Sequence, residues 1–235
     1  MVFLSFMRLP LTEIFTMKNI TTLFILFIAL TFNSKQASGQ SFINVHLGFS
    51  LSNLANADID TGNKLALTPG LGFEFWINDK IGFEPSIDYV PKGANLGVVA
   101  NVTQFSYRLN YWDVTAFAKY KAFYNPGFHL NIIGGPSYSR IANARERFFR
   151  IATLTTTDIP EGDAGIQTSD FGLNLGTELN IPTEYGYLSL RAYYQYGFGN
   201  ILQIVDSSVV STRLLNIGLV FKIRTKKLDP EGNGF

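Results

Sequence analysis

Nine charged residues lie in segments where polar and apolar side chains alternate, and all nine fall on the polar parity. Because successive side chains of a strand point to opposite faces, these residues would share one face with small polar neighbours. If that face is enclosed, charges of opposite sign are tolerated there when they pair. We therefore predict an interior ion-pair network in preference to a proton path. Its expected members are Glu74, Glu84, Asp88, Asp113, Lys119, Lys121, Glu178, Arg191 and Lys222.

The segment from Asp170 to Phe198 shows the alternation most clearly, with a break at residues 182–186. Each arm is about ten residues or longer, near the length that a tilted strand needs to cross a bilayer. The segment therefore predicts a β-hairpin with one apolar and one polar face. The apolar face carries Phe171, Leu173, Leu175, Thr177, Leu179 and Ile181 before the break, and Leu188, Leu190, Ala192, Tyr194, Tyr196 and Phe198 after it.

The composition of the two faces indicates which one is enclosed. The polar face consists mostly of Gly, Asn, Ser and Gln, which suit a crowded interior. The apolar face ends in Tyr and Phe, as at a membrane interface. A soluble, lipocalin-like binder would show the reverse, with an apolar lumen and an exterior rich in Lys and Glu. We interpret the hairpin as membrane-spanning and keep the soluble barrel as the less favoured alternative.

Residues 1–39 have the composition of a secretory signal peptide. Met17-Lys18-Asn19 gives a short basic start, residues 20–32 form an apolar run, and Ala37-Ser38-Gly39 offers small residues before a cleavage site at Gln40. The apolar run is too short for a comfortable membrane helix. We expect residues 1–39 to be removed and residues 1–16 to reflect an over-extended start. An exported chain with this alternation points to the cell outer membrane of a Gram-negative bacterium.

The whole chain predicts eight strands joined alternately by long loops and short turns. This asymmetry is typical of an all-β, eight-stranded antiparallel up-and-down transmembrane β-barrel with short periplasmic turns. The barrel would occupy residues 40–223, followed by a polar periplasmic tail at 224–235, and a bulge or kink is expected at Gly134-Gly135-Pro136. The expected strands are 42–50, 66–77, 81–90, 107–122, 128–139, two arms within 170–198, and 212–223; the long loops are 52–64, 91–104, 141–169 and 203–211.

Several short pieces carry a family resemblance that covers Phe42 to Ile223. They are Ser50-Leu51-Ser52-Asn53-Leu54, Gly82-Phe83-Glu84-Pro85, Tyr111-Trp112-Asp113-Val114 with Lys119-Tyr120, and Gly134-Gly135-Pro136. With these pieces the chain resembles the small outer-membrane β-barrel family typical of Bacteroidetes, often called PorT-like, and more distantly the OmpX and OmpA type. The resemblance implies the barrel fold and an accessory role in protein secretion across the outer membrane.

Three other features of the sequence could form a site: the histidines, a loop rich in Asp and Asn, and a basic patch. His46 and His129 are the two histidines, both on the inward parity, and no Ser/His/Asp trio suggests itself, so we expect hydrogen-bonding interior residues. Asp58 to Asn63 lacks the ligand set of a calcium loop, so no metal or cofactor is expected. One basic patch stands out and could meet lipopolysaccharide phosphates from a surface loop; it consists of Arg140, Arg145, Arg147 and Arg150.

These observations favour a non-enzymatic outer-membrane barrel that acts in envelope structure, adhesion or partner binding. The expected partners are outer-membrane lipid, lipopolysaccharide and a protein of the envelope. The near balance of 19 Lys and Arg against 18 Asp and Glu does not favour nucleic acid, and no small-molecule substrate is inferred. An outer-membrane hydrolase or acyltransferase is the alternative class. It would need a nucleophile and a histidine near the outer rim.

Overall fold

The computed structural model describes residues 40–55, 61–92, 95–99, 103–150, 155–159, 168–199 and 211–225. Within these ranges no helix is long and apolar enough to cross a membrane. The predicted signal peptide at 1–39 and the tail residues 226–235 lie outside the described residues.

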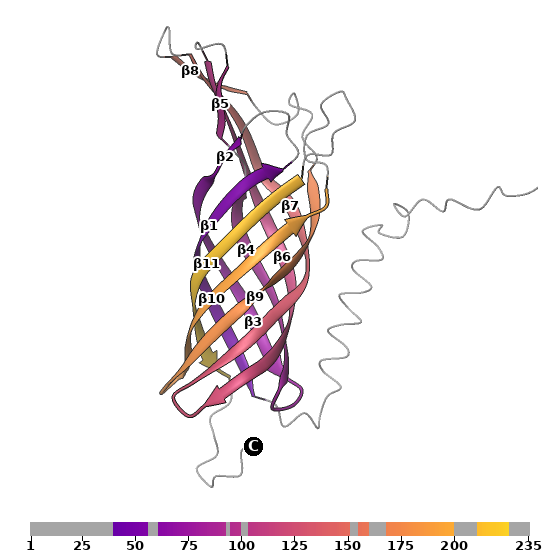
Figure 1. Ribbon diagram of the computed structural model, residues 1–235, viewed down its shortest axis with the longest axis vertical. Helices are drawn as coiled ribbons and strands as arrows, with labels where there is room; N and C mark the ends of the chain where they lie inside the picture. Colours follow the sequence, from indigo (N-terminus) through magenta and orange to yellow (C-terminus); the bar gives the residue numbers. More distant parts are fainter. Residues whose placement is uncertain are drawn as a thin grey trace, which may run out of the picture. The chain divides into compact units, whose positions relative to one another are not determined.

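Eight long strands form a closed antiparallel barrel, as predicted (Figure 1). Each strand pairs with its neighbours in the chain, and the last strand pairs with the first. This closure leaves no unpaired backbone edge within the barrel wall, as a hydrocarbon environment requires. The strands are β1 (Ser41–Ala55), β3 (Lys64–Trp76), β4 (Ile81–Lys92), β6 (Thr103–Asn125), β7 (Phe128–Arg150), β9 (Ser169–Thr183), β10 (Gly186–Gly197) and β11 (Ser211–Arg224).

The predicted long loops are partly wrong because several strands run further than the clear alternation does. β6 and β7 pair from Asn125↔Phe128 to Thr103↔Arg150, through residues assigned to loops from the sequence. Three short strands lie in the same regions: β2 (Thr61–Gly62), β5 (Asn95–Val99) and β8 (Thr155–Ile159). They extend the sheet at the end of the barrel opposite the short turns (Figure 1).

The bulge or kink predicted at Gly134–Pro136 is not a bulge, because no register shift occurs there, although the pairing with β6 is interrupted between Thr115↔Ser137 and Ala118↔Gly134. β7 keeps one register with β9 through this stretch, from Gly134↔Leu175 to Pro136↔Leu173. The irregularities in β6–β7 pairing fall elsewhere, at Asn110/Tyr111 and Lys121/Phe123. Gly135 instead allows a close approach of the two backbones, because a Cβ there would lie 1.9 Å from the carbonyl oxygen of Ala116.

The outer face of the wall is an apolar band between two aromatic bands. In the middle, Leu47, Leu219 and Leu190 lie next to one another across three strands. Near the short turns, Phe75 stacks on Phe83 and Phe123 on Phe128; toward the other end, Tyr89 meets Trp112, Tyr138 meets Phe171, and Tyr196 meets Phe198. Aromatic bands at both interfaces are typical of transmembrane barrels.

Candidate functional site

Strand register brings charged side chains from separate strands to one level of the barrel interior. Arg191 of β10 lies directly opposite Glu178 of β9. On the other side of β9, Glu178 faces Asn131 of β7. Glu74 and Glu84 fall opposite each other, between the pairs Gly72↔Ser86 and Phe75↔Phe83. All five side chains are buried.

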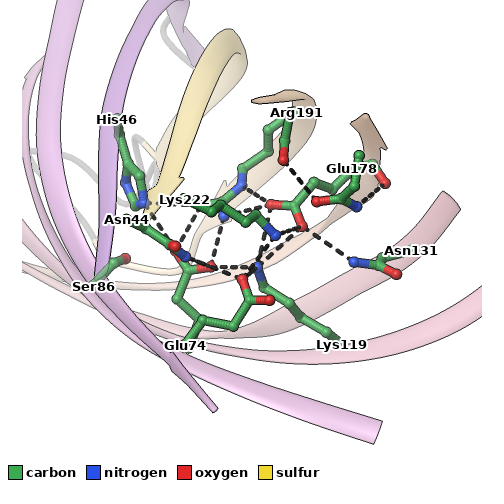
Figure 2. Close-up of polar contacts among 12 residues, drawn as sticks. Asn44, His46, Glu74, Ser86, Lys119, Asn131, Glu178, Arg191 and Lys222 are labelled. Carbon is green, nitrogen blue, oxygen red and sulfur yellow. Dashed lines mark hydrogen bonds and ion pairs between the residues drawn. The ribbon is translucent and has the colours of Figure 1, made fainter. Parts of the chain in front are cut away.

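Two lysines bridge Glu74 and Glu178 across the lumen (Figure 2). The Lys119 ammonium donates to Glu74 Oε2 at 2.5 Å and to Glu178 Oε1 at 3.1 Å, and it also pairs with Glu84. The Lys222 ammonium donates to Glu74 Oε2 at 2.8 Å and to Glu178 Oε1 at 2.5 Å. Two carboxylates so close together repel unless cations lie between them. The two ammonium groups fill that role.

Arg191 joins Glu178 to the opposite wall of the barrel. Its two terminal nitrogens donate to the two oxygens of Glu84, at 2.9 and 2.7 Å, in a bidentate contact. Its Nε donates to Glu178 Oε2 at 2.8 Å. The guanidinium also lies over the ring of Phe117, 5.3 Å from the centroid. A planar guanidinium is suited to such a role because its donors are fixed in direction.

His46 adds a fourth basic group to this cluster. Its Nε2 lies 2.9 Å from Glu84 Oε1, and its Nδ1 lies 2.8 Å from Asp88 Oδ1. Both contacts are hydrogen bonds when each ring nitrogen carries a hydrogen, which makes the ring an imidazolium. The prediction of an interior, hydrogen-bonded His46 is confirmed.

With His46 in its imidazolium form, the cluster is neutral as a whole. We call it the central network, and it consists of four carboxylates, Glu74, Glu84, Asp88 and Glu178, and four basic groups, His46, Lys119, Arg191 and Lys222. Asn44 donates to Glu74 and Glu84, and Asn131 donates to Glu178 (Figure 2). Balanced charge and satisfied oxygens are what make so many buried ions tolerable.

Little free space remains on the side of the central network where His46, Asp88 and Arg191 lie. A cavity of about 20 Å³ lies beside His46, Asp88 and Arg191, which is room for about one water molecule. Gly70 makes space for the Asp88 carboxylate, since a Cβ at residue 70 would lie 1.9 Å from Asp88 Oδ1. The interior of an eight-stranded barrel is just wide enough for side chains to fill.

A second, smaller cluster lies further from the short turns. Asp113 Oδ2 forms an ion pair with Lys92 Nζ at 3.2 Å and accepts a hydrogen bond from Gln195 Nε2 at 3.0 Å. Lys92 also donates to Ser139 at 2.7 Å, and Gln195 donates to Ser137 at 2.8 Å. The partners of Asp113 are therefore outside the central network, although its neighbour in register, Asp88, belongs to it. We call this group the outer cluster.

Lys121 differs from the other eight residues of the predicted set. It is half-buried, and its ammonium lies over the ring of Trp76, 4.8 Å from the centroid, and 5.8 Å from that of Tyr124. Its neighbour on the same face, Lys119, supplies the cation that Glu74 and Glu84 need.

The four arginines of the basic patch lie on strand β7 and not in a loop. Arg140 is exposed on the outer face, opposite Trp112 in register. Arg145, Arg147 and Arg150 pair through their backbones with β6. The loop assignment was wrong because the alternation fades beyond the barrel rim while the backbone pairing continues.

One trio in the interior has the residue types of a hydrolase but not the arrangement. Ser86 donates to Asp88 Oδ2 at 3.1 Å, and Asp88 holds His46 through Nδ1. In a nucleophilic triad the free imidazole nitrogen faces the serine hydroxyl. Here that nitrogen faces Glu84. Among the described residues no group of three or more His, Cys, Asp and Glu side chains is arranged to hold a metal ion.

Two members of these clusters were missed from the sequence alone. His46 was expected to be an interior residue but not a charged partner. Lys92 was assigned to a loop, yet it is fully buried on β4. Asp88, Val90 and Lys92 alternate along β4 and so share its inner face, which was the available signal for Lys92. Pro91 made this stretch look like the start of a loop.

Comparison with known proteins identifies the family. The model of the outer membrane protein beta-barrel domain matches residues 33–203. Similar solved structures include Ail, the attachment invasion locus protein of Yersinia pestis (17% identity, 78% of this chain and 99% of that chain, TM-score 0.36). Neisserial surface protein A is also similar (14% identity, 78% of this chain and 97% of that chain, TM-score 0.41). So is the outer membrane protease OmpT from Escherichia coli (10% identity, 79% of this chain and 96% of that chain, TM-score 0.34). No curated protein matches the chain. The chain belongs to the outer membrane protein β-barrel domain family, and it is a small barrel of the cell outer membrane with a polar, salt-bridged interior.

Proposed function

We propose that this protein is a non-enzymatic barrel that binds a protein partner at the cell surface, through the sheet that extends beyond its rim. The observation that carries this proposal is the length of two strands. β6 and β7 have 23 residues each, whereas the other six barrel strands have 12 to 15. The extra length forms a ribbon past the rim, with β2, β5 and β8 beside it (Figure 1).

The extension offers a backbone edge to a partner. Its strand order is β2-β5-β6-β7-β8, with the end strands β2 and β8 each paired on one side within the described residues. An exposed edge can accept an extended segment of another protein as an additional strand. β8 has the sequence Thr-Thr-Thr-Asp-Ile, rich in β-branched residues that favour strands. In this family the long-loop end faces the cell exterior.

A non-enzymatic role fits the interior chemistry. The buried histidines are His46, held by two carboxylates, and His129, whose ring packs against Tyr187 at 4.9 Å. A filled lumen also argues against a pore, because side chains of the two clusters cross it. We expect no stable porin-like current from the purified protein in planar bilayers, and such a current would contradict this part of the proposal.

Contact with lipopolysaccharide phosphates is the second part of the proposal. Arg140 is exposed on the outer face at the level of Trp112, near the aromatic band furthest from the short turns. A guanidinium there can donate two hydrogen bonds to a phosphate of the outer leaflet. Arg145, Arg147 and Arg150 follow on the same strand. An accessory role in protein secretion is the more specific version of the partner-binding proposal, and it requires that the bound protein belong to a secretion machine.

Site-specific photocrosslinking in intact cells tests the proposal. A photoreactive phenylalanine at Thr156 of β8 should form an adduct with a discrete protein. The same residue at Leu190, which is exposed on the apolar face of β10, should not. Replacing Thr156 and Thr157 by proline should abolish an adduct formed from position 158, because proline removes the backbone donor that strand addition needs. Absence of any protein adduct from β8 would contradict the proposal.

A further inference from the structure

We infer that the cavity at the short-turn end of the barrel is a binding site for a small amphipathic anion, a ring-sized apolar body with one phosphate or carboxylate. The cavity has a volume of about 830 Å³, within the range of small-ligand sites. It lies on the opposite side of the central network from the surface extension. A ligand in this cavity therefore does not depend on the protein partner proposed for the surface extension.

The cavity reaches from an exposed turn to a buried member of the central network. Its rim is the exposed turn Asn78-Asp79-Lys80. Its floor includes Glu74, which is 1% exposed and belongs to the central network. The network closes the lumen above this point, so a molecule that enters here meets a dead end and not a passage.

Lys121 supplies the charge for an anion. Its ammonium lies at the wall, over Trp76 at 4.8 Å and near Tyr124 at 5.8 Å. A cation held against aromatic faces keeps its N–H donors available for an oxygen acceptor. Lys121 is half-buried, so its charge is less screened than that of a surface lysine.

The floor does not compete for that cation. Glu74 Oε1 accepts from Trp76 Nε1 at 2.7 Å, and Glu74 Oε2 accepts from Lys119 and Lys222. Both oxygens of Glu74 are hydrogen-bonded, and the two lysines of the central network offset its charge. An entering anion therefore meets Lys121 without strong repulsion from the floor.

Aromatic rings supply the apolar part of the site. Phe42 packs edge-on against Tyr187 at 5.5 Å, and Tyr187 packs against His129 at 4.9 Å, nearly perpendicular. These rings and Trp76 line the same cavity. Flat faces beside the Lys121 ammonium fit a ring or short apolar chain with an anionic end better than a free inorganic ion.

Calorimetry on the full barrel in lipid nanodiscs tests the assignment with four probes: phenylphosphate, phenylacetate, inorganic phosphate and the neutral phenyl glucoside. Phenylphosphate or phenylacetate should bind saturably with one site per barrel, and their relative affinities distinguish a phosphate from a carboxylate ligand. Inorganic phosphate and phenyl glucoside should bind at least tenfold more weakly, because each lacks one of the two features.

Two variants locate the site. Lys121→Met keeps most of the side-chain bulk and removes the charge, and it should weaken binding at least tenfold. Arg213→Gln removes a cation at the other end of the barrel, where Arg213 of β11 lies over the ring of Tyr196, and it should leave binding unchanged. A Trp112→Phe background leaves Trp76 as the one tryptophan of the two in the chain, so its fluorescence should change on binding. No saturable binding to the unmodified barrel, or equal binding to Lys121→Met, would overturn the inference.

Discussion

The two halves of the barrel interior are filled by different chemistry. In the half near the short turns, eight acidic and basic groups form one network, in which Glu178 and Glu84 each contact three basic groups. In the other half, the described residues include one ion pair, Lys92–Asp113, which lies among Ser and Gln side chains. The central network joins strands across the lumen through charge, whereas the outer cluster relies mainly on neutral hydrogen bonds. Loss of one group should therefore cost more in the central network.

Removal of the Glu178 charge should have the largest effect. Glu178→Gln leaves Lys119, Lys222 and Arg191 with one carboxylate fewer in a fully buried site. Breaking a buried ion pair from one side costs about 3–5 kcal/mol. We expect the free energy of unfolding, measured by urea titration in lipid vesicles, to fall by that amount. A loss below ~1 kcal/mol would place the group in a solvated site.

A charge on the outer face should have the next largest effect. Ile217 is exposed on β11, beside Phe49 and Ala192 in the apolar band. Arginine near the bilayer midplane costs about 2–4 kcal/mol in such barrels, so Ile217→Arg should impair folding into vesicles. Asn216→Ser, one residue away on the inner face, should fold with a normal yield. Equal yields for the two variants would contradict the assigned facing.

The outer cluster should be less sensitive than the central network. Asp113→Asn keeps an oxygen for Lys92 and Gln195 while removing the charge, and Lys92 retains Ser139. A hydrogen bond to a charged group contributes about 2 kcal/mol, so we expect a loss of that size in the same urea titration. A loss as large as that of Glu178→Gln would remove the distinction between the two halves.

Lys121→Met should have the smallest effect on stability. The ammonium contacts two rings at the mouth of the cavity, and such contacts contribute about 0.5–1 kcal/mol when exposed. We expect a change below ~1 kcal/mol in the free energy of unfolding. A loss of several kcal/mol would instead make Lys121 part of the central network.

The sequence predicts the barrel well because its signal is local. A period of two identifies each strand and the side of the wall on which each residue lies, and the inward charges follow directly. The strand ends beyond the rim are harder, because a backbone ladder outside the bilayer does not require alternation. Residues 141–150 show this, since they read as a loop yet pair with β6 throughout.

Alternation in the sequence also does not predict which side chains pair across the lumen. Glu178 and Arg191 are neighbours on one hairpin, and their pairing could be anticipated from the turn between them. Glu84 and Arg191 are 107 residues apart and meet because strand tilt and closure bring β4 and β10 to face each other. The role of His46 depends on the same geometry, which periodicity does not contain.

A double-mutant cycle on Arg191 and Glu178 tests the central claim most directly. Arg191→Met and Glu178→Gln each leave the central network with one uncompensated charge, whereas the double variant restores the balance. The sum of the losses in unfolding free energy of the two single variants should therefore exceed the loss of the double variant by about 2 kcal/mol or more. A coupling energy near zero would show that the two side chains do not share a buried site, and it would contradict a charge-balanced interior.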